Sequence, residues 1–303
     1  MFGMIHRVLA DFLRSQSGET GEETQLLSET LQTIMTPEAC RDPNQWALMI
    51  ACGLHGEALL MVLQDLAPKQ HSPTVVRLRL LLGILHSAQG LYGRAREQEE
   101  EAVFYARTNL GEEHPDTLTS MNNLASTLSH QGEYAGAVAL QRTVLERRQR
   151  ILGEEHPSTL TSMNNLALTL SDQGEYAGAV ALQRLVLDLR QRQLGVDHPD
   201  TLTAMGILAL TLFRQGEYVE ARTLQISVLE RTQRILGEEH PSTSLSAWNY
   251  LNLLLQTGDT ETTLDILRKY LLWLLERDPS TLGGHQQRIR AGVAKFLESA
   301  EGS

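Results

Sequence analysis

The chain has 303 residues, with 26 Lys and Arg against 37 Asp and Glu, and a formal net charge of −11 at pH 7. This acidic balance argues against a general nucleic-acid binder and against a protein that binds anionic membranes. Apolar residues make up 42% of the chain, enough for a core. No run approaches the ~20 apolar residues of a membrane-spanning helix. We therefore expect a folded protein with no membrane insertion.

The first 72 residues carry no repeated motif and offer three or four short helical stretches. His6, Arg7 and Asp11 interrupt the apolar residues of 1–13, which predicts a short amphipathic helix rather than a signal peptide. The polar segment Ser17–Thr24 is expected to be a loop. Residues 1–72 are thus predicted to form an N-terminal helical cap or divergent repeats.

The two cysteines, Cys40 and Cys52, have no Cys-x-x-Cys partner, which favours a reducing cytoplasm. Cys52 lies close to His55 in sequence. In this helical, apolar setting we expect a buried structural thiol rather than a nucleophile.

A repeated motif begins after this region. Gly-x-x-His-Pro starts at Gly111, Gly153, Gly195 and Gly237, 42 residues apart, and Gln-Gly-Glu-Tyr recurs with the same step. A fixed period of this size indicates a solenoid of stacked units, because a unit this thin cannot bury its apolar faces alone. The predicted units are 73–110, 111–152, 153–194, 195–236 and 237–276.

Each unit is predicted to be two helices joined by a turn. Apolar residues recur at helical spacing over 115–130, which we name helix A of the unit, and again over 133–152, helix B. Gly132 and Gly153 are expected to end these helices in the left-handed conformation. Residues 277–303 are predicted to be a capping helix and a tail, with an amphipathic helix over 286–300. The fold class is therefore all-α.

The motif resembles a known family. Asn-Leu-Ala, then Gln-Gly-Glu-Tyr-x-x-Ala, then Leu-Gly-x-x-His-Pro-x-Thr, resembles the 42-residue tetratricopeptide repeats (TPR) of kinesin light chains, over about 73–276. The resemblance implies a right-handed superhelical solenoid whose A helices line a concave groove. It also implies that groove asparagines hold an extended peptide, and Asn123, Asn165 and Asn249 are the matching residues.

The exposed A-helix positions change along the chain. Paired asparagines occupy the centre, and amides can both donate to and accept from a peptide backbone. The corresponding positions in the C-terminal half of the groove are apolar. Units 111–152 and 153–194 differ at seven positions, and two of these, 126 and 130, lie on one helical face. Alternatively, the asparagines only bond neighbouring helices. The candidate partner-binding residues are Asn122, Asn123, Ser126, His130, Asn164, Asn165, Leu168, Asp172, Phe213, Arg214, Trp248, Asn249 and Asn252.

The sequence predicts no metal-binding or catalytic site. The recurring histidines, His114, His156, His198 and His240, should be at least ~8–10 Å apart in neighbouring units, whereas zinc needs nitrogens at ~2.0–2.1 Å. We expect them to form hydrogen bonds in the inter-repeat turns. There is no P-loop, Gly-x-Ser-x-Gly or His-Glu-x-x-His motif. No catalytic residue, metal or cofactor is therefore expected.

Three functions remain open on the sequence. The first is a non-catalytic cytoplasmic adaptor that binds a peptide or helix of a partner protein in the groove. The partner should not be strongly acidic, because Arg77 and Arg214 are the only basic groove residues. The second is a self-associating scaffold, a homo-oligomer formed through 1–72 and 245–300, with Trp248 and the apolar run 271–275 as its surface. The third is an enzyme whose catalytic part lies in 1–72.

Overall fold

The computed structural model describes residues 29, 31–42, 45–66 and 72–301. The helix expected over 1–13 and the loop expected over Ser17–Thr24 lie outside the described residues. The structure divides into two compact parts, Met1–Asn165 and Leu166–Ser303, which we call the N-terminal body and the C-terminal body. Every regular element among the described residues is helical.

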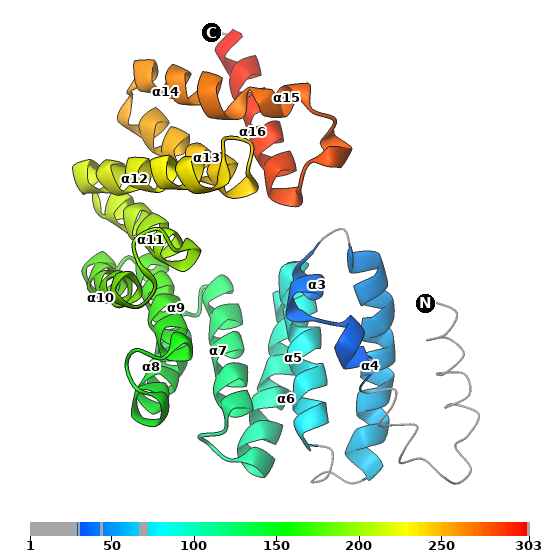
Figure 1. Cartoon of the computed structure of the whole chain (residues 1–303). Coiled ribbons are helices and arrows are strands. Elements are labelled where there is room, and N and C mark those ends of the chain that lie inside the picture. Colours follow the sequence, from blue (N-terminus) through cyan, green and yellow to red (C-terminus); the bar gives the residue numbers. More distant parts are fainter. Residues whose placement is uncertain (1–28, 30, 43–44, 67–71, 302–303) are drawn as a thin grey trace. The chain divides into compact units, whose positions relative to one another are not determined.

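In the N-terminal body, successive helices pack side by side (Figure 1). Helix α5 packs against α6, α6 against α7, and α7 against α8, while α3 and α4 cover the free side of α5. The boundary between the two bodies falls inside α9. The helices are α3 (Pro37–Arg41), α4 (Trp46–Leu66), α5 (Ser72–Ala88), α6 (Tyr92–Leu110), α7 (Pro115–His130), α8 (Tyr134–Leu152) and α9 (Pro157–Gln173).

The C-terminal body continues the alternation of A and B helices up to α13, and α14, α15 and α16 then close its end (Figure 1). The second helix of the last unit is interrupted: a π-helical turn, Leu267–Leu271, separates α14 from α15. The helices are α10 (Tyr176–Leu194), α11 (Pro199–Gln215), α12 (Tyr218–Leu236), α13 (Pro241–Thr257), α14 (Thr260–Ile266), α15 (Trp273–Glu276) and α16 (Gly284–Glu301).

Glycines at a regular interval end the helices. Nine glycines of the described residues have a positive φ, from Gly90 to Gly258 at a spacing of 21 residues. A residue without Cβ adopts this conformation at no steric cost, so each half of the 42-residue unit can stop its helix. No other described residue has a positive φ. Helix A of 111–152 spans Pro115–His130, as predicted, and helix B begins at Tyr134.

The four recurring histidines cap the A helices. In each, Nδ1 accepts a hydrogen bond from the backbone N–H two residues further on, over 3.1 Å, and proline follows as the first helical residue. This bond satisfies one of the free N–H groups of the helix start. The expected role of these residues in turn hydrogen bonding is therefore confirmed, and its form is an N-cap.

The residues that pack between the helices are small. Ala125, Ala167 and Ala209 on the A helices are at most 1% exposed, and Ala137 on helix B is fully buried. The fold is thus an all-α array of helix–turn–helix repeats with further helices before and after it.

Both cysteine thiols are buried and free. Burial raises the pKa of Cys40 to about 11 and also raises the pKa of Cys52. The thiols therefore remain protonated and pack as small apolar groups, as expected for Cys52. None of the described helices is long and apolar enough to cross a membrane.

Candidate partner-binding site

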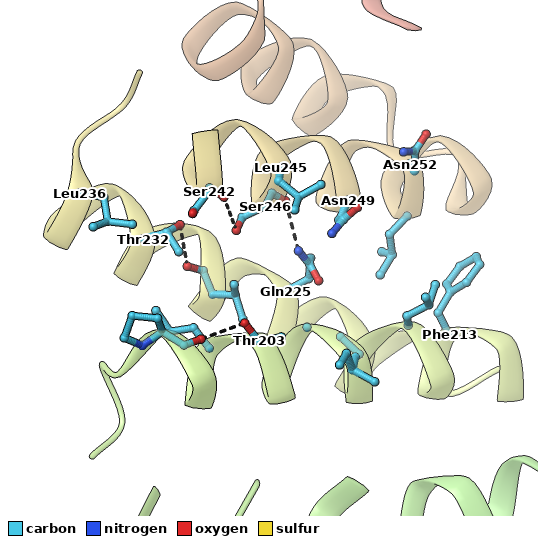
Figure 2. Close-up of a pocket in the computed structure, with 18 of the residues that line it drawn as sticks. Thr203, Phe213, Gln225, Thr232, Leu236, Ser242, Leu245, Ser246, Asn249 and Asn252 are labelled. Carbon is cyan, nitrogen blue, oxygen red and sulfur yellow. Dashed lines mark hydrogen bonds between the residues drawn. The ribbon is translucent and has the colours of Figure 1, made fainter. Parts of the chain in front are cut away.

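A pocket of about 480 Å³ opens in the C-terminal body, between two A helices and the B helix that joins them (Figure 2). Figure 2 shows α11 and α13 facing each other across it, with Gln225 and Thr232 of α12 between them. We call it the α11–α13 pocket. Its volume lies in the range of small-ligand and peptide side-chain sites, ~300–1,000 Å³.

The walls of the α11–α13 pocket are mainly apolar. Ile207, Leu210 and Phe213 of α11 face Leu245 of α13. Leu210 is 50% exposed and Leu245 is 38% exposed. The ring of Phe213 rests on Tyr218, with centroids 5.3 Å apart, which fixes its position. Apolar surface that remains open to water is where an apolar ligand group gains most by burial.

Three side-chain amides border the pocket along α13. Asn249, Asn252 and Gln256 follow each other at spacings of three and four residues and therefore share one helical face. None of the three amides has a hydrogen-bond partner among the described residues. Each offers two N–H donors and an acceptor oxygen. This edge can thus bond a peptide backbone without losing an internal bond.

The pocket lining holds almost no charged groups. Among its lining residues Asp197 alone is ionisable. Its carboxylate already accepts hydrogen bonds from Arg231 at 2.6 Å and from Arg234 at 2.7 Å. Two guanidiniums bind this one carboxylate, so no residue of the lining presents an unpaired charge to a ligand.

A second, smaller cavity lies in the N-terminal body. It measures about 310 Å³ and is lined by Leu80, Leu81 and Ile84 of α5, with Thr119 and Asn123 of α7. The guanidinium of Arg77 stands at its edge without an ion-pair partner among the described residues. Both cavities are thus lined by A-helix positions that the sequence analysis assigned to the groove.

Four of the predicted site residues line a cavity. Phe213, Asn249 and Asn252 line the α11–α13 pocket, and Asn123 lines the smaller one. Two others, Ser126 and Leu168, line neither: Ser126 is half-buried, and Leu168 is 38% exposed.

The other central asparagines are engaged within the fold. Asn165 Nδ2 donates to Asn122 Oδ1 over 3.1 Å, and the side chain of Asn164 is buried. For Asn122, Asn164 and Asn165 the structure favours the alternative, a role between helices, over a free peptide-binding amide. The predicted groove position of Asn164 is wrong, because its side chain is buried by its neighbours, although Gly206 at the equivalent position lines the α11–α13 pocket.

The charged and aromatic candidates also have internal partners. His130 stacks on Tyr92 with ring centroids 5.1 Å apart and donates from Nδ1 to Ser126 O over 2.7 Å. Asp172 and Arg214 form an ion pair at 2.7 Å. Their charges therefore compensate each other.

Trp248 lies elsewhere than the sequence predicted. It was predicted to face the groove, but it packs into the C-terminal core, over Gly292 of α16. The reason is that α16 folds back onto α13 and covers that side of the helix.

Helix B contributes residues that the sequence analysis missed. Gln225, Val228 and Thr232 of α12 form part of the lining, and Gln225 Nε2 donates to Ser246 O over 3.1 Å. Only A-helix positions were considered in the sequence. Comparing equivalent residues between units would have shown that position 232 departs from the arginines at 148 and 190.

The repeats define the class of protein. The tetratricopeptide repeat family model matches residues 80–149, 116–192, 165–223 and 200–271, which together make up more than half of the chain. The chain belongs to the tetratricopeptide repeat family. Repeats of this kind are generally non-catalytic protein-interaction modules.

Solved structures of similar fold include kinesin-light-chain repeats. A putative kinesin light chain from Podosopora anserina, with nearly identical TPR-like repeats, is 26% identical. The match covers 70% of this chain and 98% of that one, with a TM-score of 0.60. BtubC (BKLC) from P. vanneervenii is 19% identical over 82% of this chain and 92% of that one, with a TM-score of 0.60.

A third structure contains a bound peptide. NprR in complex with its cognate peptide NprX is 11% identical, over 98% of this chain and 78% of that one, with a TM-score of 0.60. At this identity the likeness shows the fold alone. No curated protein matches the chain in sequence.

Proposed function

We propose that the protein is a non-catalytic adaptor and that the α11–α13 pocket binds a peptide segment of a partner protein. The observation that carries this proposal is the combination of an apolar pocket of about 480 Å³ with three unbonded amides along one edge. Peptide recognition needs both parts: an apolar anchor for affinity and polar groups that fix the backbone.

The amides and the apolar walls of the pocket contribute different amounts of binding free energy. A hydrogen bond from a side-chain amide to a peptide backbone contributes only about 0.5–1.5 kcal/mol net. Burying an apolar side chain contributes about 1.5–3 kcal/mol. Asn249 and Asn252 therefore orient the segment, while Phe213, Leu210 and Leu245 supply most of the affinity.

The charges argue against a strongly acidic segment. The pocket lining holds no cation, and the nearby Arg214 is already paired with Asp172. A carboxylate placed in the pocket would lose its hydration without a compensating partner. Fold neighbours support peptide binding in general, since NprR and a Rap protein were solved in complex with NprX and with competence and sporulation factor.

The apolar residues expected to mediate self-association in the scaffold hypothesis are packed in the C-terminal core. Trp248 and the run 271–275 belong to the core formed by α13, the π-helical turn, α15 and α16. Leu271 and Leu274 are fully buried. These residues therefore cannot supply the exposed apolar face that self-association through them would need. We further propose that 1–72 form an N-terminal cap or divergent repeats, that 277–303 cap the other end of the array, and that the protein acts in the cytoplasm.

The test compares two pairs of asparagines. Peptides selected on the full chain from a displayed random library are titrated against the parent and against Asn249→Ala/Asn252→Ala. We expect affinity to fall about tenfold, the equivalent of two hydrogen bonds at the low end of their range, with an unchanged melting temperature. The matched control is Asn122→Ala/Asn165→Ala, which should lower the melting temperature and leave affinity intact. Unchanged affinity of the first variant would contradict the proposal.

A further inference from the structure

We infer that Gly206 and Thr232 are the residues that determine the specificity of the α11–α13 pocket, and that its ligand is a bulky uncharged apolar side chain of a partner peptide. This inference rests on the proposed function and adds the chemistry of the anchor. It starts from two places where unit 195–236 departs from the two units before it.

The first departure is at position 232. The equivalent residues 42 and 84 positions earlier are Arg190 and Arg148. Arg148 is 8% exposed, and its Nη1 donates to Ser158 O at 3.0 Å and to Ser162 Oγ at 2.9 Å, on the next A helix. Arg190 Nη1 likewise donates to Asp200 O at 2.9 Å. In both cases a long side chain crosses from helix B to the start of the following helix A.

Thr232 makes no such crossing. Its hydroxyl donates within its own helix, to Val228 O and Leu229 O at 2.9 and 3.0 Å. Ser242 and Ser246, the counterparts of the two serines that Arg148 contacts, line the pocket instead, and Ser246 Oγ donates to Ser242 O at 2.9 Å. The space that a guanidinium chain occupies in the earlier unit is thus part of the cavity here.

The second departure is at position 206. Its equivalents are Asn122 and Asn164, but here the residue is glycine in the interior of α11. A Cβ built on Gly206 would meet no atom within 4 Å, so neither the backbone nor a close neighbour requires glycine at this position. Glycine inside a helix costs about 1 kcal/mol relative to alanine. What glycine provides here is open volume on the pocket wall.

The two departures act on the same cavity from different helices. Gly206 on α11 and Thr232 on α12 both line it, and each replaces a longer polar side chain. The lost groups are polar, and what remains is bounded by Ile207, Leu210 and Leu245. The α11–α13 pocket is therefore deeper and more apolar than it would be with the residues of the two preceding units.

The charges around the α11–α13 pocket determine which kind of side chain it can bind. Asp197 is the one ionisable lining residue and already binds Arg231 and Arg234, so a cationic side chain finds no free carboxylate and an anionic side chain finds no cation in the lining. Burying an unpaired charge is unfavourable, whereas a Leu, Ile, Met, Phe or Trp side chain gains from the open apolar surface. The occupant is therefore a bulky uncharged apolar residue of a peptide whose backbone bonds the α13 amides.

The test restores the residues of the two preceding units. In Gly206→Asn/Thr232→Arg, the new residues are those found at the equivalent positions of units 111–152 and 153–194. The new arginine has Ser242 and Ser246 as partners, so we expect the variant to fold. The matched control is Thr223→Arg, the same substitution on an exposed position of α12, where Thr223 also bonds within its helix. Circular dichroism melting checks the fold, and Gly206→Asn alone serves if the double variant does not fold.

The probe is a phage-displayed library of random dodecapeptides, selected on the full parent chain and measured one by one by calorimetry. We expect the selected peptides to share a bulky apolar residue and to bind the restored variant at least tenfold more weakly. The control variant should bind like the parent. Selected peptides that bind parent and restored variant equally, or that share a charged residue, would overturn the inference alone. A library from which the parent enriches no peptide would contradict the proposed function as well.

Discussion

Asn165 donates a hydrogen bond from its side-chain amide to the side-chain oxygen of Asn122 over 3.1 Å, joining one A helix to the next. The two residues are members of the asparagine pairs that the sequence marks as peptide contacts, and both are half-buried. Residues of one type at repeated positions therefore have different roles: Asn249 is the equivalent of Asn165, but the preceding A helix carries Gly206 where the earlier pair has Asn122, so Asn249 has no such partner.

The first prediction concerns this bond. We expect Asn165→Ala to lower the free energy of unfolding by about 1 kcal/mol, the net worth of one such bond between uncharged groups. A double-mutant cycle with Asn122→Ala should give a coupling energy of similar size, since the two amides are in direct contact. Chemical denaturation of the four proteins measures it. Additive effects of the two substitutions would show that the bond does not contribute.

The second prediction concerns the histidine caps. His198 Nδ1 accepts from the backbone N–H of Asp200, at the start of α11. We expect His198→Ala to destabilise the protein by about 1 kcal/mol, as for the loss of other N-cap acceptors. His198→Asn keeps a side-chain acceptor on a short stem and should recover most of the loss. The melting temperatures of the two variants decide the matter, and equal losses would contradict a capping role.

The repeated elements could be predicted because their determinants are local. A His-Pro pair opens α7, α9, α11 and α13, and a glycine with positive φ follows each helix from α5 to α13, so a few residues of sequence define these boundaries. The interruption of the last B helix could not be read in the same way. The run 271–275 has no period of its own, and its π-helical turn lies where several elements of the C-terminal core pack together.

Only the A-helix residues of the candidate site could be predicted from the sequence. Side-chain direction in a helix follows from its 3.6-residue period, which is why the pattern led to Phe213, Asn249 and Asn252, three residues that line the cavity. A cavity also depends on volume missing from a neighbouring element. The replacement of Arg148 and Arg190 by Thr232 can be read in the sequence, but the space that it leaves open follows only from the contacts that Arg148 makes and Thr232 does not.

The third prediction is a pH dependence. Glu99 is 1% exposed, and one of its carboxylate oxygens has no hydrogen-bond partner among the described residues. Burial raises its pKa from 4.5 to about 7. The equivalent residues of the next three units, Gln141, Gln183 and Gln225, are neutral. At this position the fold accommodates an uncharged side chain.

The sign follows from proton binding. Between about pH 4.5 and 7 the folded chain keeps the Glu99 proton that the unfolded chain has released, so stability falls as the pH rises through this window. Glu99→Gln should therefore stabilise the protein by about 3 kcal/mol at pH 8 and by little at pH 4. Melting curves across this range measure the difference. Glu97→Gln, on the same helix but less buried, is the control. An equal effect of Glu99→Gln at both pH values would refute the assignment.

The fourth prediction concerns Gly206 by itself. Because a Cβ at this position meets no atom within 4 Å, Gly206→Ala gains helix propensity without a clash. We expect the free energy of unfolding to rise by about 1 kcal/mol. Thermal and urea unfolding measure the gain, and a loss of stability would mean that the space at position 206 is needed for packing.

The fifth prediction uses the same substitution where it should have the opposite sign. A Cβ on Gly292 of α16 would lie 2.5 Å from Cη2 and 2.7 Å from Cζ2 of Trp248, which is closer than packed carbon atoms approach. The clash should outweigh the gain in helix propensity, so Gly292→Ala is expected to destabilise the protein by about 1–3 kcal/mol. Gly206→Ala is the matched control. Adding Trp248→Leu, which removes the indole ring from the contact, should relieve the clash and recover part of the loss. If Gly292→Ala were as stabilising as Gly206→Ala, the packing of Trp248 between α13 and α16 would be wrong, and the tryptophan would be free to face a partner.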